Sequence, residues 1–466
     1  MKKQAFNPYL PSWEYIPDGE PYVFDGRVYV YGSHDFSNGH VFCLGDYVCW
    51  SAPVDDLGNW RYEGVIYRIC EDPLNRDGKM CLYAPDVTVG SDGRYYLYYV
   101  LDRVSVVSVA VCDTPAGTYR FLGYVHDKAG QRLGERPGDE PQFDPGVLTE
   151  GDRTYLYTGF CGRGDKGRHG AMATVLGPDM LTMEEEPVFI VPGAEYAAET
   201  GYEGHAFFEA PSIRKMGDTY YFIYSSEVMH ELCYATSLQP REGFVYGGVL
   251  VSNCDLHIDR YKPADMPTAY GANNHGSMVR IGEDWYIFYH RHTNGTWYSR
   301  QGCAERLTVL PDGTIRQAEL TSCGLNGGPL KGEGEYPTYI ACNLFTKKPS
   351  IYVGETFPKI VQDGKDGDEV IGTIANITDG TTIGFKSFDI KHLTEIAIEV
   401  HGYMHGVFHV KTAWDQESIC DIPVTSANRW ERFSAPVKLP DGVYALYFQY
   451  EGSGTVGMKS FHLVCE

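Results

Sequence analysis

The sequence repeats one short pattern five times: a turn followed by a strand rich in tyrosine. Asp-Gly, Gly-Asp or Gly-Glu stands at each turn, where a tight hairpin needs positive φ, and β-branched or aromatic residues follow, as a strand prefers. The copies share a closing tyrosine, at Tyr31, Tyr98, Tyr157, Tyr224 and Tyr289. The period of about 65 residues is the length of one blade of four strands. Because one such unit cannot bury both of its faces, the repeat predicts a five-bladed β-propeller.

Length and composition agree with an all-β protein of more than one domain. A chain of 466 residues exceeds one core of about 100–150 residues. Its 36 Tyr, 21 Phe, 53 Gly and 26 Pro suit many short strands joined by tight turns. We expect the propeller to occupy residues 1–320 and to close near the strand-like segment 306–310.

The net charge excludes some classes of binding partner, and the first residues and the cysteines indicate the cellular compartment. A formal net charge of -23 would repel nucleic acid and anionic membranes, whereas a neutral substrate would not be repelled. The first residues show no apolar run typical of a secretory signal or a membrane helix, so we expect a cytoplasmic protein. The 13 cysteines predict reduced, buried thiols. Nothing in the sequence indicates the oligomeric state.

A polar residue precedes the closing tyrosine of each repeat by 11 to 15 residues. Four of these residues are acids and one is a histidine, namely Glu20, Asp86, Asp144, Glu209 and His275. Innermost strands of a propeller enter the central channel side by side, so equivalent residues should meet around the axis. Clustered carboxylates shift one another's pKa values, which allows one to act as an acid and another as a base. This division is what cleavage of a glycosidic bond requires.

Several stretches resemble glycoside hydrolase family 43, and the resemblance covers most of residues 7–315. The matching stretches are Asn7-Pro8-Tyr9-Leu10-Pro11, Tyr83-Ala84-Pro85-Asp86-Val87, Phe143-Asp144-Pro145 and Glu209-Ala210-Pro211-Ser212-Ile213-Arg214-Lys215. The resemblance implies a five-bladed propeller that hydrolyses arabinose- or xylose-containing glycans with inversion of configuration. It also implies that no cofactor is required for the reaction.

The resemblance assigns roles to three acids. It implies that Glu209 is the general acid and that Asp144 orients it and tunes its pKa. The family's base is an Asp followed by Pro in the first blade, but here Glu20 stands before Pro21. Glu20 is the preferred candidate, and the alternative is Asp18, which lies two residues earlier on the same face of an extended segment.

Other positions are candidates for binding the sugar or an ion. His275 matches a blade-five histidine that some relatives place near a central calcium ion or its water. The alternative is a hydrogen-bonded structural histidine, because calcium prefers oxygen ligands. The predicted substrate-binding residues, in the matching stretches or just after a closing tyrosine, are His34, Asp35, Tyr83, Asp86, Phe143 and Arg291. For Arg291 a solvated surface position is an equal alternative.

The last third of the chain predicts a second domain. Residues 321–342 are rich in Gly and Glu and are expected to connect the domains. Residues 343–466 contain runs of alternating apolar and polar residues, which predict a jelly-roll-like β-sandwich. This part weakly resembles family 6 carbohydrate-binding modules. Trp414 and Trp430 could provide a sugar platform, or the sandwich could only brace the propeller, so no binding residues are assigned.

The sequence as a whole predicts an exo-acting glycosidase that releases terminal α-L-arabinofuranosyl or β-xylosyl residues from plant-type oligosaccharides. One alternative within the same fold is a β-galactofuranosidase or another furanosidase. An alternative of a different class is a propeller that binds glycans without cutting them. The paired acids Glu209 and Asp144 favour an enzyme, because a lectin does not need a matched acid.

Overall fold

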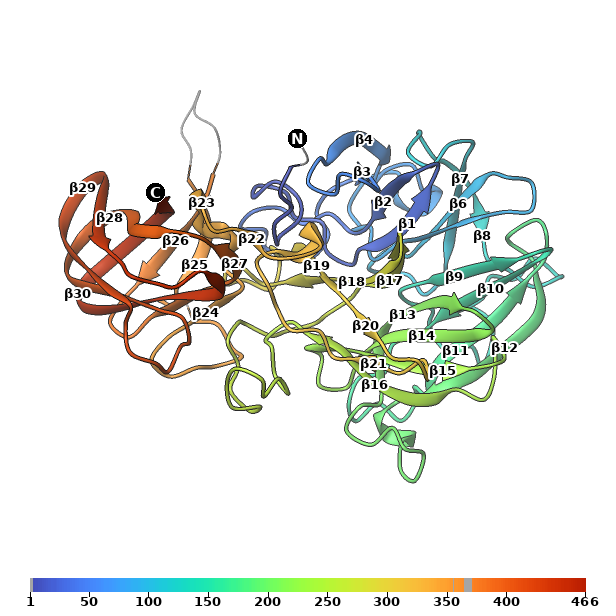
Figure 1. Ribbon diagram of the computed structural model, residues 1–466. Coiled ribbons are helices and arrows are strands. Elements are labelled where there is room, and N and C mark those ends of the chain that lie inside the picture. The colour runs from blue at the N-terminus through green and yellow to red at the C-terminus, as the bar shows by residue number, and fades with distance from the viewer. Residues whose placement is uncertain (1–2, 355, 364–370) are drawn as a thin grey trace.

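The computed structural model describes residues 3–354, 356–363 and 371–466 and shows five sheets around one axis, followed by a C-terminal sheet (Figure 1). Each of the first four sheets is an antiparallel meander of four strands. These strands are β1 (Glu20–Phe24), β2 (Arg27–Tyr31), β3 (Tyr47–Pro53), β4 (Arg61–Tyr67), β5 (Asp86–Val89), β6 (Tyr95–Tyr99), β7 (Ser108–Cys112), β8 (Arg120–Tyr124), β9 (Gly146–Glu150), β10 (Arg153–Thr158), β11 (Gly170–Leu176), β12 (Met183–Pro192), β13 (Phe207–Met216), β14 (Thr219–Ser226), β15 (Glu231–Ser237) and β16 (Val245–Ser252). The fifth sheet comprises β17 (Met278–Ile281), β18 (Asp284–Arg291) and β19 (Gln301–Arg306).

The predicted five-bladed propeller is confirmed, and the repeated tyrosines explain why the blades pack. Each closing tyrosine lies in the second strand of its blade and is at most 2% exposed. Its ring therefore belongs to the core rather than to the surface. Tyr157 and Tyr224, for example, share one cluster with residues of blades three and four. The repeat thus places one large aromatic side chain per blade where it is fully buried.

The N-terminal segment closes the ring between the first and fifth blades. Gly19 forms an isolated parallel bridge with Gly276, and the Tyr9 amide donates to the Gly302 carbonyl at 3.2 Å. The Asn7 side chain donates to the Ala304 carbonyl and accepts from the Ala304 amide, both at 2.9 Å. The opening segment therefore lies along the three-stranded fifth blade, and this contact carries the start of β1 to the axis.

After the hairpin of β20 (Thr308–Val309) and β21 (Ile315–Arg316), the chain enters the C-terminal sheet. Its nine strands are β22 (Leu330–Lys331), β23 (Gly334–Pro337), β24 (Asn343–Phe345), β25 (Lys359–Asp363), β26 (Ile371–Ile377), β27 (Thr382–Ile390), β28 (Leu393–Lys411), β29 (Cys420–Pro436) and β30 (Gly442–Cys465). Residues 321–342, predicted as a connector, contain β22 and β23, which pair with β27 and β30. Short 3₁₀-helices span Pro73–Asn75, Ala194–Tyr196, Gly324–Asn326 and Thr338–Ile340.

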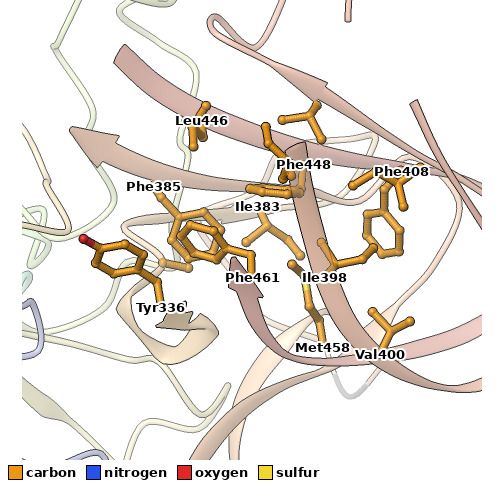
Figure 2. Packing of buried hydrophobic residues seen from close by; sticks show 14 of the residues in the cluster. Tyr336, Ile383, Phe385, Ile398, Val400, Phe408, Leu446, Phe448, Met458 and Phe461 are labelled. Atoms are coloured by element: carbon orange, nitrogen blue, oxygen red, sulfur yellow. The ribbon is translucent and has the colours of Figure 1, made fainter. Parts of the chain in front are cut away.

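This sheet folds over on itself and so forms the predicted β-sandwich. Phe448 and Phe461 lie 13 positions apart on β30, about 43 Å along a straight strand, yet their ring centroids are 5.4 Å apart. The strand must therefore turn between them, and Gly454, with φ of 82°, lies in that stretch. Figure 2 shows Phe448 and Phe461 facing one another with Phe385 in the apolar core between the layers.

Within the described residues, no helix is long and apolar enough to cross a membrane. The thirteen cysteines are all unpaired. A buried lysine of the sandwich, Lys386, pairs with Glu319 of the propeller at 2.7 Å, and Asp255 lies 3.6 Å from the same ammonium. Such a buried ion pair requires both partners, because either charge alone would be costly to bury. The two domains are therefore held in one fixed contact at this point.

Candidate active site

A pocket of roughly 300 Å³ opens at the axis, on the side where the innermost strands begin. Every blade contributes to its lining: Asp18 precedes β1, Tyr83 precedes β5, Asp144 precedes β9, Glu209 lies on β13 and His275 precedes β17. Aromatic side chains complete the wall, among them Phe42, Phe143, Phe160, Phe208 and Trp297. Its volume is at the small end of the ~300–1,000 Å³ range of ligand pockets, which suits a single sugar ring.

Asp18 is held in the pocket by a buried cation. Arg300 Nη1 donates to Asp18 Oδ1 at 2.9 Å, and His290 Nδ1 lies 3.3 Å from the same oxygen. Burial acts to raise the pKa of Asp18, but the charge of Arg300 and the contact with His290 hold it well below its usual range. Asp18 is therefore a carboxylate across the whole neutral range.

Glu209 and Asp144 have the opposite tendency. Burial, followed by the nearby Asp18 charge, raises the pKa of Glu209 to about 8. Burial and the carboxylates of Glu209 and Asp18 raise the pKa of Asp144 well above its usual range. Two neighbouring buried carboxyls that repel each other share a proton rather than ionise together. The pocket thus contains one permanent carboxylate, Asp18, and a pair of carboxyls, Glu209 and Asp144, that retains a proton.

A β-bulge directs Glu209 into the pocket. Glu209 pairs with Ser225 and Ser212 pairs with Ile223, so β13 contains one residue more than β14 in this interval. Ala210 takes up the bulge with φ of 63°, a conformation that a residue with a side chain rarely adopts. Asp18 and Asp144 also have positive φ, of 57° and 44°. Backbone strain therefore accompanies all three acids.

Glu20 and Asp86, predicted as base and sugar ligand, do not line the pocket. Glu20 pairs with Arg214 Nη2 at 2.6 Å, and Asp86 accepts hydrogen bonds from the Tyr22 hydroxyl and the Val147 amide. Glu20 begins β1 and lies 3.9 Å from His275 Nε2, whereas Asp18, outside the strand, lies 3.9 Å from Nδ1 of the same ring. Of the two candidates for the base, the structure therefore places Asp18, not Glu20, in the pocket.

Three further predicted ligands contact protein groups instead of the pocket. His34 contacts Glu14 at 3.0 Å, and Asp35 accepts from Arg300 Nε at 2.8 Å. Arg291 is buried and donates to the Ala341 carbonyl at 3.1 Å, which excludes both sugar contact and a solvated surface position. Arg300, nine residues further on, occupies the place expected for Arg291. No sequence signal indicated this role, because Arg300 follows a loop outside the repeated pattern.

His275 lies at the centre of the acids. Its Nδ1 is 3.6 Å from Asp144 Oδ2 and 3.9 Å from Asp18 Oδ1, and its Nε2 is 3.9 Å from Glu20 Oε1. Burial lowers the pKa of His275 to about 4 in spite of the Asp18 charge, and the positive charge of Arg300 acts in the same direction as burial. A neutral imidazole thus separates the pocket acids from Glu20 below.

The chain is similar to several known proteins. The profile described as "Glycosyl hydrolases family 43" matches residues 20–315. A "Xylosidase/arabinosidase" of Thermoclostridium stercorarium is 68% identical over 470 residues, covering 99% of each chain. A "Xylosidase/arabinosidase" of Bacteroides ovatus is 29% identical over 316 residues, which are 60% of this chain and 87% of the relative.

Two solved structures share the fold. One is a family 43 β-xylosidase/α-arabinofuranosidase from a compost microbial metagenome, in complex with xylotriose and in a calcium-free form. It is 26% identical with a TM-score of 0.53 and covers 68% of this chain and 98% of that one. The other, an arabinoxylan arabinofuranohydrolase from Bacillus subtilis in complex with cellotetraose, covers 99% of this chain and 97% of that one. Its TM-score is 0.54 at 20% identity, so it shows the likeness of the two-domain fold alone.

The strained bulge gives a stability test. Replacing Ala210 with glycine should leave the melting temperature unchanged or raise it, because glycine adopts φ near 63° without strain. The matched control is Ala304→Gly on β19, where the register with β18 is unbroken, which should cost about 0.5–1 kcal/mol. Thermal unfolding followed by circular dichroism measures both. Equal losses in the two variants would show that Ala210 is not strained.

Proposed function

The chain belongs to glycosyl hydrolase family 43, and from this membership we propose that it releases terminal α-L-arabinofuranosyl or β-xylosyl residues from plant-type oligosaccharides. The observation that carries the proposal is the opposite ionisation of acids lining one small pocket. Asp18 is held as a carboxylate, whereas Glu209 retains its proton at neutral pH. This is the division of labour that glycoside hydrolysis needs.

In the proposed mechanism Glu209 protonates the oxygen of the leaving group while Asp18 takes a proton from the attacking water. Arg300 keeps Asp18 ionised and, through Asp35, fixed in position. Asp144 supports the proton on Glu209, because two adjacent charges would repel each other in the buried pocket. The sugar carbon is attacked from the face opposite the leaving group, so the configuration inverts.

The pocket also supports exo action on a neutral, terminal sugar. Its small volume accommodates one ring rather than a chain that runs through it. Tyr83, Phe143 and Trp297 offer apolar surfaces on which a sugar ring can stack. The aromatic wall and the buried acids exclude anionic substrates by desolvation and repulsion.

We also propose that the protein works in the cytoplasm on imported oligosaccharides. The thirteen unpaired cysteines support this location, since an oxidising compartment favours disulfides. Activity recovered in the secreted rather than the cytoplasmic fraction of the source cells would contradict it.

The central experiment compares three acid variants on two kinds of leaving group. Asp18→Asn and Glu209→Gln should each lower kcat by about 10²–10⁴-fold. The Glu209→Gln loss should be larger on oligosaccharides than on nitrophenyl glycosides, because nitrophenolate leaves without a proton. The Asp18→Asn loss should be equal on both. Glu20→Gln, outside the pocket, should lose at least about tenfold less than Asp18→Asn.

The same assays separate the alternatives. Nitrophenyl α-L-arabinofuranoside and β-xyloside should be cleaved, and proton NMR should show an inverted first product. Cleavage of the β-galactofuranoside alone would overturn the substrate class. Binding of glycans without release of nitrophenol from any glycoside would make the protein a lectin. A retained configuration would contradict the role of Asp18 as a base.

The pKa of Glu209 gives a pH test. Because the protonated form is the active one, kcat should be retained below pH ~8 and lost above it. Asp144→Asn removes a like charge, lowers the pKa of Glu209 and so moves this loss to lower pH. Asp152→Asn, in an exposed turn of the same blade, is the control and should leave the profile unchanged. An unmoved alkaline limb in Asp144→Asn would refute the coupling.

We include a hydrated calcium ion beside His275 in the proposal. Glu20 Oε1 is buried, accepts no hydrogen bond from the described residues and lies 3.9 Å from His275 Nε2. Glu20 would hold such an ion directly and His275 through a water molecule, and water would supply most of its six to eight oxygen ligands. After chelation, calcium should raise the melting temperature of the wild type and of the surface control His169→Ala, but not that of His275→Ala. A wild type indifferent to calcium would exclude the ion.

A further inference from the structure

A second group of metal-ligating side chains lies in blade four, outside the pocket. His205 precedes β13 by two residues, and His257 lies in the loop after β16. Glu231 and Cys233 lie two positions apart on β15 and therefore on the same face of the strand. None of these four side chains lines the pocket.

The donor atoms converge on the Glu231 carboxylate. His205 Nδ1 lies 2.9 Å and Cys233 Sγ 3.7 Å from Oε2, and His257 Nε2 lies 3.2 Å from Oε1. The donors of His205, Glu231 and Cys233 all lie within 4.8 Å of one another. Ser226 also donates to Oε2, at 2.9 Å.

Burial and charge single out this carboxylate. The Glu231 side chain is 1% exposed, yet among the described residues its ion-pair partners are the two histidines and no lysine or arginine. Its Oε1 accepts no hydrogen bond from the described residues. A buried carboxylate is normally paired with a permanent cation or a metal ion. The half-buried ring of His205 and the exposed ring of His257 leave a route to it from solvent.

We propose that these four side chains bind a zinc ion. His205 Nδ1, one Glu231 oxygen, the Cys233 thiolate and His257 Nε2 provide four donors for a tetrahedral site. Bonds of ~2.0–2.3 Å place tetrahedral ligands about 3.3–3.8 Å apart, so the two histidine nitrogens, at 2.9 and 3.2 Å from the carboxylate, would move away from it by a few tenths of an ångström. His257 is exposed and does not belong to the group of donors within 4.8 Å of one another, so its ring would also move toward His205 and Cys233. The Cys233–Glu231 distance already lies in this range.

The donor chemistry selects the metal. Two nitrogens, one sulfur and one carboxylate suit zinc and cobalt, whereas calcium requires oxygen ligands. Burial raises the pKa of the Cys233 thiol, so the thiol is protonated without metal. Binding therefore forms a zinc–sulfur bond and releases the Cys233 proton to solvent. A plain His–Glu–His hydrogen-bond cluster would neither involve the thiol nor release this proton.

The site would brace the blade that carries Glu209. His205 lies four residues before Glu209, and Met229, which lines the pocket, lies two residues before Glu231. One ion would thus join the start of β13, the start of β15 and the loop after β16. Its expected role is structural, and it does not depend on the proposed hydrolysis.

The test uses the full chain without a polyhistidine tag, freed of metal by chelation. Titration with cobalt should give a tetrahedral spectrum with a thiolate-to-metal charge-transfer band, and zinc should abolish this spectrum and raise the melting temperature. Cys233→Ser should weaken binding by at least the roughly 10–100-fold that loss of an outer-shell partner costs. Cys112→Ser, at a buried cysteine of blade two, is the matched control and should bind as the wild type.

A cobalt complex without the thiolate band would overturn the proposal, as would equal affinities of Cys233→Ser and Cys112→Ser. Absence of binding to the wild type would overturn it as well. The wild-type spectrum decides the matter even if Cys233→Ser fails to fold, and His257→Gln, at an exposed position, provides a second variant with weakened affinity. Calcium should not displace cobalt, and this result would distinguish the zinc site from the proposed calcium site beside His275.

Discussion

The closed ring of blades and the charge in the pocket both depend on the hydrogen bonds that the Arg300 guanidinium donates. It lies at the end of the fifth blade and binds Asp18 and Asp35, which both belong to the first. All three groups are buried, so removal of the cation would leave two carboxylates without compensation. The same contact that joins the ends of the propeller therefore keeps one pocket acid charged. Closure of the ring and the low pKa of Asp18 depend on the same contact.

A second buried arginine gives the channel two levels of charge. Arg214 pairs with Glu20 beneath the pocket, as Arg300 pairs with Asp18 within it, but burial and the Asp86 charge still raise the pKa of Glu20 to about 8. The neutral imidazole of His275 lies between the levels. Glu209 has no such partner: no ion pair to its side chain exists among the described residues, and its pKa is raised accordingly. The opposite pKa shifts of Asp18 and Glu209 thus follow from the direct contact of Arg300 with Asp18.

The internal repeat of the sequence predicted the fold and part of the pocket. Repeats reveal positions that symmetry makes equivalent, and Asp144 and Glu209 are at such positions. Symmetry failed where the chain departs from it: Asp18 enters through the closing segment, and Arg300 follows an irregular loop in a three-stranded blade. Asp86 also stands at a repeated position, but its carboxylate accepts hydrogen bonds from Tyr22 and Val147 and does not line the pocket. The repeat therefore predicted which acids lie around the axis, but it did not predict how far along the axis each acid lies.

The C-terminal sandwich contacts the loops that shape the fifth-blade side of the pocket. The Ile360 amide donates to Thr293, and the Gly271 amide donates to Ile351. These contacts flank the segments that carry Trp297 and Asn273 into the pocket wall.

The two tryptophans that could have formed a sugar platform make contacts within the protein. Trp414 donates to the Tyr261 carbonyl, and Trp430 packs on His401. Arg291, expected to meet the sugar, instead binds Ala341 at this boundary. The contacts therefore favour a sandwich that supports the pocket over one that binds a separate glycan.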